Sequence, residues 1–327
     1  MIFRKYVISK RHFFLEECMK LSLILILLCT LLTPAFSQKK NNSFVGRWGF
    51  NITTQSGTGA SWLGIKEKNR SLEIWYQPTG GHVYQVNNFK LDGSRLIITV
   101  SQASGKRSAV TWKLEALGDM LIGIQTRGEN TATLTGLRQP ELKRSVPKSW
   151  TEPKPLFNGK NLDGWETIGS RDSHWVVKDG LLINEERGAN LKTTGTYDDF
   201  KLHFEVNCPG NGNSGFYLRG RYEVQFEYGP LGNTPPNRQM GAVYGRIAPS
   251  VELPRTPGEW ETFDVTLVGR MVTVVRSGVT TIDNKEIEGI TGGALNANEG
   301  EPGPFYIQGD HAGNLKFRNI TISVPKR

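Results

Sequence analysis

Residues 210–228 read GNGNSGFYLRGRYEVQFEY and contain two short runs in which apolar and polar residues alternate. Side chains change face at every residue of a strand, so the alternation predicts an antiparallel pair with one apolar face and one polar face. The polar positions are Tyr217, Arg219, Glu223, Gln225 and Glu227. A phenol, a guanidinium, an amide and two carboxylates together favour the floor of a polar-ligand site. A hydrated outer face with compensating charges is the alternative, because such alternation is ordinary in antiparallel sheets.

The sequence around this pair, residues 156–327, predicts many further strands and no long helix. WVVKDGLLIN at 175–184 has an Asp-Gly turn between two strand-like runs, and DDFKLHFEVN at 198–207 alternates strictly. His203 and Glu205 share the polar face of that second run. Two antiparallel layers without helices predict a jelly-roll sandwich of the concanavalin type, which is similar to the fold of laminarinases. The sheet of such a sandwich curves, and its concave side can hold a sugar.

Residues 38–140 carry a different all-β pattern. Short strand-like runs separated by Gly, Asn and Asp follow one another at nearly even spacing. This spacing predicts a small up-and-down β-barrel or sandwich. The opening GRWGF, with Trp48 in the first strand, is similar to lipocalin-like barrels. A proline-rich, aperiodic stretch at 141–155 predicts a linker, so the chain is expected to have two domains.

The N-terminus has the composition of a secretory signal peptide. An apolar run, LSLILILLCTLL at 21–32, follows Met19-Lys20 and precedes the small-x-small sequence Ala35-Phe36-Ser37. The run is shorter than the ~20 residues that a membrane helix needs. We therefore expect residues 1–37, starting at Met1 or at Met19, to be removed, leaving a mature periplasmic or extracellular protein without a membrane span.

Charge and cysteine content argue against nucleic-acid binding and against a cysteine nucleophile. The net charge of +9 comes from scattered basic residues, and no nucleic-acid motif accompanies it. Cys18 and Cys29 leave with the predicted signal peptide, so Cys208 has no internal disulfide partner and is expected to be a buried or edge thiol.

The order of several motifs gives a family resemblance. They are LFNGKNLDGW at 156–165, WVVKDGLL at 175–182, DFKLHFE at 199–205, GNSGFYLRG at 212–220, YEVQ at 222–225, GAVYG at 241–245, GEWETFD at 258–264, IQGDH at 307–311 and FRNI at 317–320. In these motifs the second half of the chain resembles the 3-keto-disaccharide hydrolase family. Where the family often reads Gln-x-x-Asp, this chain has Gln225-Phe226-Glu227, whose carboxylate is one methylene longer.

The resemblance implies cleavage of glycosides whose C3 hydroxyl has been oxidised to a ketone by a separate nicotinamide-dependent oxidoreductase. The ketone acidifies C2–H, so a base can remove that proton, the C1 substituent leaves, and water adds to the product. Such a site needs a base, an acid and donors for the enolate oxygen. The acid and base candidates are His311, Glu223, Glu227, Glu205 and His203. The candidates for substrate binding are Arg219, Gln225, Tyr217, Tyr244, Gln308 and Trp260.

Two other functions stay open on the same fold. Glu223 and Glu227 could form the pair of a conventional retaining glycosidase, although Gln225 replaces the Asp that laminarinase-type strands carry between them. A non-catalytic carbohydrate-binding module would need the aromatic and amide groups but not His311. No metal or phosphate-loop motif is present, so we expect no cofactor, while a structural calcium held by backbone carbonyls stays open.

Overall fold

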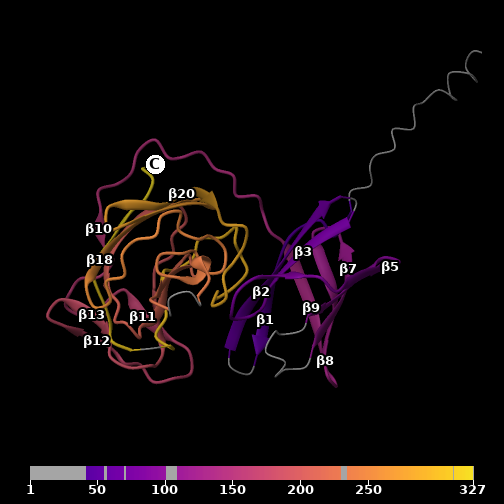
Figure 1. Cartoon of the computed structure of the whole chain (residues 1–327), viewed down its shortest axis with the longest axis horizontal. Coiled ribbons are helices and arrows are strands. Elements are labelled where there is room, and N and C mark those ends of the chain that lie inside the picture. Colours follow the sequence, from indigo (N-terminus) through magenta and orange to yellow (C-terminus); the bar gives the residue numbers. More distant parts are fainter. Residues whose placement is uncertain are drawn as a thin grey trace, which may run out of the picture. The chain divides into compact units, whose positions relative to one another are not determined.

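The first part of the chain folds into an antiparallel meander (Figure 1). The computed structural model describes residues 42–54, 57–69, 71–100, 109–229, 234–311 and 313–326. Within these ranges the strands of the meander are β1 (Gly46–Thr54), β2 (Gly57–Lys68), β3 (Ser71–Gln77), β4 (Tyr84–Val86), β5 (Phe89–Asp92), β6 (Arg95–Val100), β7 (Val110–Leu117), β8 (Met120–Arg127) and β9 (Asn130–Arg138). Their order, β4-β3-β2-β1-β9-β8-β7-β6-β5, joins the first strand to the last, as in an up-and-down barrel.

Aromatic side chains fill the interior of this barrel-like sheet. Trp112 lies at its centre, with ring centroids 4.8 Å from Phe50 and 5.2 Å from Tyr76, both in edge-to-face geometry. The run HVYQVNNFKLD at 82–92 holds two separate strands, β4 and β5. β4 pairs with β3 and β5 with β6, and the Thr99 amide donates to Asn88 O at the connection between them.

The second part of the chain forms two facing sheets. In the described residues the larger sheet comprises β10 (Lys154–Pro155), β12 (Trp175–Lys178), β13 (Leu181–Asn184), β15 (Phe200–Asn207), β18 (Trp260–Val268), β19 (Met271–Arg276), β20 (Val279–Glu286) and β22 (Leu315–Ser323). The smaller sheet, in the order β11-β14-β21-β16-β17, comprises β11 (Trp165–Ile168), β14 (Asn190–Thr193), β16 (Asn213–Leu218), β17 (Tyr222–Glu227) and β21 (Tyr306–Ile307). The single helical turn in the described ranges is the 3₁₀ segment Pro236–Arg238.

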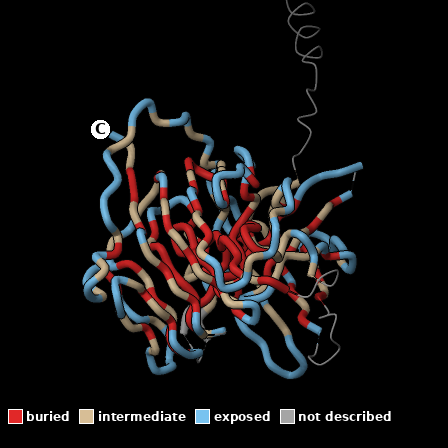
Figure 2. The backbone as a smooth tube through the Cα atoms, turned by 60° about the vertical axis from the view of Figure 1, so that its left-hand side comes forward, coloured by how far each residue is buried: buried red, intermediate tan, exposed pale blue. Residues whose placement is uncertain are grey.

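Apolar positions of the alternating strands meet between these two sheets. Phe204 of the larger sheet stacks on Phe216 of the smaller sheet at 4.7 Å and on its neighbour Phe263 at 5.2 Å. All three side chains are fully buried, and each contributes about 1.5–3 kcal/mol to folding through its transfer from water. Figure 2 shows the buried residues running along the strands and the exposed ones along the connecting loops. The predicted all-β jelly-roll class is confirmed.

Residues 43–327 form one compact unit. The division into domains at 140 and 156 stays a prediction, and the last residues of the predicted linker already belong to β10, which pairs with β22. The predicted signal peptide at 1–37 lies outside the described residues. In the described part of the chain, no helix has the length and apolar character needed to cross a membrane.

Candidate functional site

A row of polar side chains crosses four strands of the smaller sheet. Lys192 of β14 pairs with Tyr306 of β21, Tyr306 pairs with Tyr217 of β16, and Tyr217 pairs with Glu223 of β17. Directly paired residues of antiparallel strands project to the same face. Tyr217 and Tyr306 are in contact, with ring centroids 4.4 Å apart. The row lies on the face opposite to the sandwich core and forms the floor of the candidate site.

Glu223 is the most strongly perturbed carboxyl group of this floor. Its side chain is almost fully buried and accepts a 2.7 Å hydrogen bond from the Tyr217 hydroxyl. Burial raises the pKa of Glu223 to about 8, although the Tyr217 hydroxyl and the charge of His311 both lower it. Glu223 is therefore mostly protonated at neutral pH and can donate a proton.

His311 forms a pair with its neighbour Asp310 in the loop that follows β21, within the IQGDH motif. The Nδ1 atom of His311 lies 2.8 Å from Asp310 Oδ1. An ionised carboxylate only accepts, so Nδ1 carries the proton and Nε2 is the basic atom of the neutral ring. This hydrogen bond raises the pKa of His311, to which the charge of Glu223 also contributes. Burial and the hydrogen bond with His311 act in opposite directions on Asp310, and its pKa is lowered.

Other side chains fix the loop that carries this pair. Asn190 Oδ1 accepts from the backbone amides of Gly309 and Asp310, at 2.7 and 3.2 Å. The guanidinium groups of Arg171 and Arg187 donate to Asp310 O, at 3.0 and 2.7 Å. The backbone at residues 309 and 310 is therefore held from both sides, next to the His311 side chain, which is 44% exposed.

A cavity of about 1480 Å³ opens beside this row. From the jelly roll it is lined by Tyr306, Asp310, Lys192 and Arg171, together with the loop 292–296. From the barrel-like sheet it is lined by Asn51, Gly59, Thr79 and Gly80. Tyr217 contacts the lining residue Tyr306, and Glu223 is bonded to Tyr217 behind it. His311 adjoins the lining residue Asp310. Ligand pockets for small molecules commonly measure about 300–1000 Å³, so this cavity is large enough for more than one sugar ring.

Two amides of the floor have unused acceptor atoms. Gln308 Nε2 donates to the Tyr217 hydroxyl at 3.0 Å, and Gln225 Nε2 donates to Glu227 Oε2 at 3.0 Å. The Oε1 atoms of both amides are buried and have no hydrogen-bond partner among the described residues. Tyr244 also reaches this region, since its backbone amide donates to Glu223 O, and burial raises its pKa.

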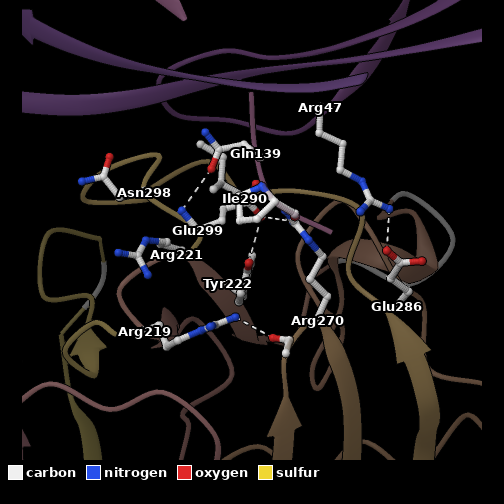
Figure 3. Close-up of polar contacts among 12 residues, drawn as sticks. Arg47, Gln139, Arg219, Arg221, Tyr222, Arg270, Glu286, Ile290, Asn298 and Glu299 are labelled. Carbon is white, nitrogen blue, oxygen red and sulfur yellow. Dashed lines mark hydrogen bonds and ion pairs between the residues drawn. The ribbon is translucent and has the colours of Figure 1, made fainter. Parts of the chain in front are cut away.

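Four of the predicted site residues lie elsewhere. His203 and Glu205 are on β15 of the larger sheet, where His203 pairs with Asp264 and Glu205 accepts from Arg318 and Asn319. Trp260 is on β18 of the same sheet, under the guanidinium of Arg318 at 4.0 Å. Arg219 follows the end of β16, has a φ of 53°, and donates to Asp198 and Gly269 O (Figure 3).

The structure also adds four residues to the site that the sequence did not single out. They are Lys192, Tyr306, Asp310 and Asn190. Asp310 could have been found from its position before His311 in IQGDH. The other three could not, because their contacts join segments separated by about a hundred residues and follow no local period.

The described residues contain no cluster of metal ligands, and their one cysteine is not a reactive thiol. Among the described residues, no group of three or more His, Cys, Asp or Glu side chains could hold a metal ion. Cys208 is buried at the end of β15, and burial raises the pKa of its thiol to about 12. A thiol with this pKa is a poor nucleophile at neutral pH.

Residues 152–323 match the model of the 3-keto-alpha-glucoside-1,2-lyase-like domain, which covers more than half of the chain. The chain belongs to this family. The resemblance predicted from the motifs of the jelly roll is confirmed, and the family supports a carbohydrate-active function of the glycosyl hydrolase kind.

Solved structures show matches of limited similarity over about half of this chain. A proposed glycosyl hydrolase from Parabacteroides distasonis is 28% identical, with 55% of this chain and 92% of that chain covered and a TM-score of 0.45. A second from the same organism is 23% identical, with coverages of 53% and 98% and a TM-score of 0.43. The carbohydrate-binding module CBM66 from Bacillus subtilis is 10% identical, with coverages of 49% and 96% and a TM-score of 0.31. No curated protein matches the chain.

Proposed function

We propose that this glycosyl-hydrolase-like protein cleaves 3-keto-glycosides at the smaller sheet of its jelly roll. The observation that carries the proposal is the pairing of opposite protonation roles in one region. Glu223 has a pKa of about 8 and holds a proton at neutral pH, whereas the His311 imidazole, oriented by Asp310, presents a basic Nε2. An elimination next to a ketone needs one group of each kind.

The reaction is written with His311 as the base. Nε2 takes the proton from C2, the electrons of the C–H bond form the enolate, and the C3 oxygen gains negative charge. The enolate then collapses with formation of the C1–C2 double bond and cleavage of the bond between C1 and the leaving oxygen. Glu223 gives its proton to that oxygen, so the aglycone departs as an alcohol. Addition of water to the unsaturated sugar completes a hydrolysis.

Lys192 is suited to stabilise the enolate oxygen. It lines the cavity in the same row as Tyr306 and Glu223, and its Nζ forms a 2.5 Å ion pair with Glu166 of β11. A fixed cation at the point where negative charge develops lowers the barrier more than a mobile one. Tyr217 and Gln308 act as positioning residues, because the amide donates to the phenol and the phenol donates to Glu223.

The ketone itself has to come from another protein. We propose a separate nicotinamide-dependent sugar 3-oxidoreductase as the functional partner, and export to the periplasm or the extracellular space as the location, as the N-terminal sequence predicts. In this scheme the chain needs no nicotinamide cofactor of its own, since elimination and water addition involve no net oxidation.

Product formation from two substrates tests the proposal. The purified protein receives a 3-keto-glucoside or its unoxidised parent, with no added cofactor, and release of the aglycone is measured. We expect release from the keto substrate alone, and loss of that activity in His311→Ala. Cleavage of the parent glycoside would instead favour a retaining pair of Glu223 and Glu227. Sugar binding without turnover of either substrate would favour a carbohydrate-binding module and contradict the enzymatic proposal.

A further inference from the structure

The cavity beside the catalytic row is not built by the jelly roll alone. Asn51 of β1, Gly59 of β2 and the turn residues Thr79 and Gly80 after β3 form part of its lining. These residues belong to the barrel-like sheet, outside the segment that matches the family model. The jelly roll contributes Tyr306, which contacts the Tyr217 that bonds to Glu223, and Asp310, which bonds to His311. The barrel-like sheet therefore supplies part of the cavity lining in addition to the part that the jelly roll supplies.

The turn that carries Thr79 and Gly80 is held in one conformation. Gln77 is fully buried, and its Nε2 donates to Pro78 O and to Gly81 O, both at 3.0 Å. The Ser61 hydroxyl donates to Gln77 O at 2.7 Å. A residue whose side chain bonds both ends of a turn fixes that turn before any ligand arrives, which reduces the ordering cost of binding.

The turn also packs tightly against the jelly-roll loop on the other side of the cavity. A Cβ atom added to Gly292 would lie 1.8 Å from Gly81 O, so the two backbones are in close contact. At Gly80, by contrast, nothing lies within 4 Å of an added Cβ atom. The two backbones therefore touch at residue 81, while Thr79 and Gly80 are exposed and line the cavity.

The jelly-roll loop 287–301 includes the lining residues 292–296. Polar contacts hold other parts of this loop to β1 and to Gln139, the residue that follows β9. Asn51 Oδ1 accepts from the Ala297 amide at 2.7 Å, and Asn51 Nδ2 donates to Asn298 Oδ1 at 2.8 Å. Gln139 Oε1 accepts from the Glu299 amide at 3.1 Å (Figure 3). Arg246, bonded to Ile290 O, stacks on the ring of Trp62 at 4.4 Å. The cavity wall is thus a built interface with its geometry fixed from both sides.

We propose that the barrel-like sheet supplies a subsite for the part of the substrate beyond the reacting sugar, with Thr79 and Gly80 as specificity-determining residues. This inference rests on the proposed function for the identity of the reacting sugar. The hydroxyl of Thr79 and the open backbone of Gly80 suit the hydroxyl groups of a second sugar, and the volume of the cavity exceeds the need of a single ring. The barrel-like sheet therefore favours a substrate that carries a group beyond the reacting sugar over a simple methyl glycoside.

The test fills the cavity from an exposed position. Thr79→Trp and Thr79→Arg place large side chains there, and Thr133→Trp makes the same change at an exposed position of β9 that does not line the cavity. For each variant, kcat/KM is measured on a 3-keto-disaccharide and on methyl 3-keto-glucoside. We expect both Thr79 variants to lower the ratio of the two values by about tenfold or more, since hydrophobic or polar misfit at a subsite costs at least that much. Thr133→Trp should keep the wild-type ratio.

A binding measurement separates this inference from the proposed function. Titration calorimetry with an unoxidised disaccharide and with glucose needs no turnover. Weaker disaccharide binding in Thr79→Trp, with glucose binding changed less, supports the subsite even if no keto substrate is cleaved. Unchanged ratios in both assays, or equal losses for the large and the small ligand, would overturn the subsite. Equal thermal midpoints of the three variants and the wild type exclude misfolding as the cause.

Discussion

The Tyr217 hydroxyl donates a 2.7 Å hydrogen bond to Glu223 Oε2, and both side chains are buried on the face of the smaller sheet that turns away from the core. This contact joins two directly paired strand residues, so backbone register fixes its geometry. The contact also affects the pKa of Glu223. Burial raises the pKa of Glu223 while the phenol lowers it, and the result, about 8, keeps the proton available at neutral pH without making it too strongly held to transfer.

Replacement of Glu223 by Gln should remove the acid and keep the shape of the site. We expect kcat on a 3-keto-glycoside to fall by about 10²- to 10⁴-fold, the usual contribution of a positioned acid or base. Glu205→Gln is the matched control, because Glu205 bonds to Arg318 and Asn319 on the larger sheet. Equal losses in the two variants would show that Glu223 has no special role.

The pH dependence of kcat/KM should be bell-shaped. His311 must be neutral to act as the base, and its pKa lies above the ordinary 6.5, so activity should rise as the pH passes that raised value. Glu223 must be protonated to act as the acid, so activity should fall as the pH passes about 8. Asp310→Asn removes the carboxylate that raises the pKa of His311, and should shift the acidic limb to lower pH while reducing the maximum. An acidic limb that does not move in this variant would contradict the pairing.

Removal of the Tyr217 hydroxyl should move the other limb. In Tyr217→Phe the hydrogen bond that lowers the pKa of Glu223 is lost, so this pKa should rise and the alkaline limb should shift to higher pH. Kinetics over the alkaline range measure the shift. Tyr244→Phe is the control in the same region, because the backbone of Tyr244, and not its hydroxyl, bonds to Glu223 O. A purely structural role of Tyr217 would lower activity at all pH values without moving the limb.

The parts of this site that a sequence can predict are those set by a local period. Alternation over 222–227 placed Glu223, Gln225 and Glu227 on one face because the strand is regular there. The same reasoning extended to Arg219 goes one residue too far, since β16 ends at Leu218 and Arg219 enters a left-handed turn that directs it to Asp198. Periodicity also gave His203 and Glu205 a common face, but it contains no information on which sheet carries them.

Contacts between segments far apart in the sequence could not be predicted. Tyr306 lies in a strand of two residues, too short for any pattern, and it completes the row only by pairing with Lys192 and Tyr217. His311 was predicted from the family motif IQGDH and not from any strand pattern. The contribution of Thr79 and Gly80 to the cavity depends on packing between the barrel-like sheet and the loop 287–301, which neither pattern nor motif expresses.

Glu299 should be decisive for stability at that packing surface. Its carboxylate is fully buried, forms an ion pair with the buried Arg270 and accepts from the Tyr222 hydroxyl at 2.8 Å, while Arg270 also donates to Pro140 O (Figure 3). Glu299→Gln leaves the Arg270 charge uncompensated, and we expect the free energy of unfolding to fall by about 3–5 kcal/mol. Glu288→Gln breaks the exposed pair with Lys66 and should cost about 0–1 kcal/mol. Urea denaturation of both variants provides the comparison, and similar losses would contradict this account.

Glu223 should also make the folded protein less stable as the pH rises. Its pKa in the folded state, about 8, is above the 4.5 of an exposed glutamate. The folded state therefore keeps a proton that the unfolded chain has lost, so the stability associated with this group is full below about pH 4.5 and declines until the pH passes about 8. Glu223→Gln has no such proton to lose. Its thermal midpoint relative to the wild type should therefore increase steadily between these two pH values and stay constant above them.

Glu205→Gln, at a carboxyl group whose pKa is lowered, should show a trend of the opposite sign over the acid range, since its ionised form is the one that the fold stabilises. A constant difference in midpoint between Glu223→Gln and the wild type at every pH would mean that Glu223 is ionised in the folded protein, and would remove it as the acid.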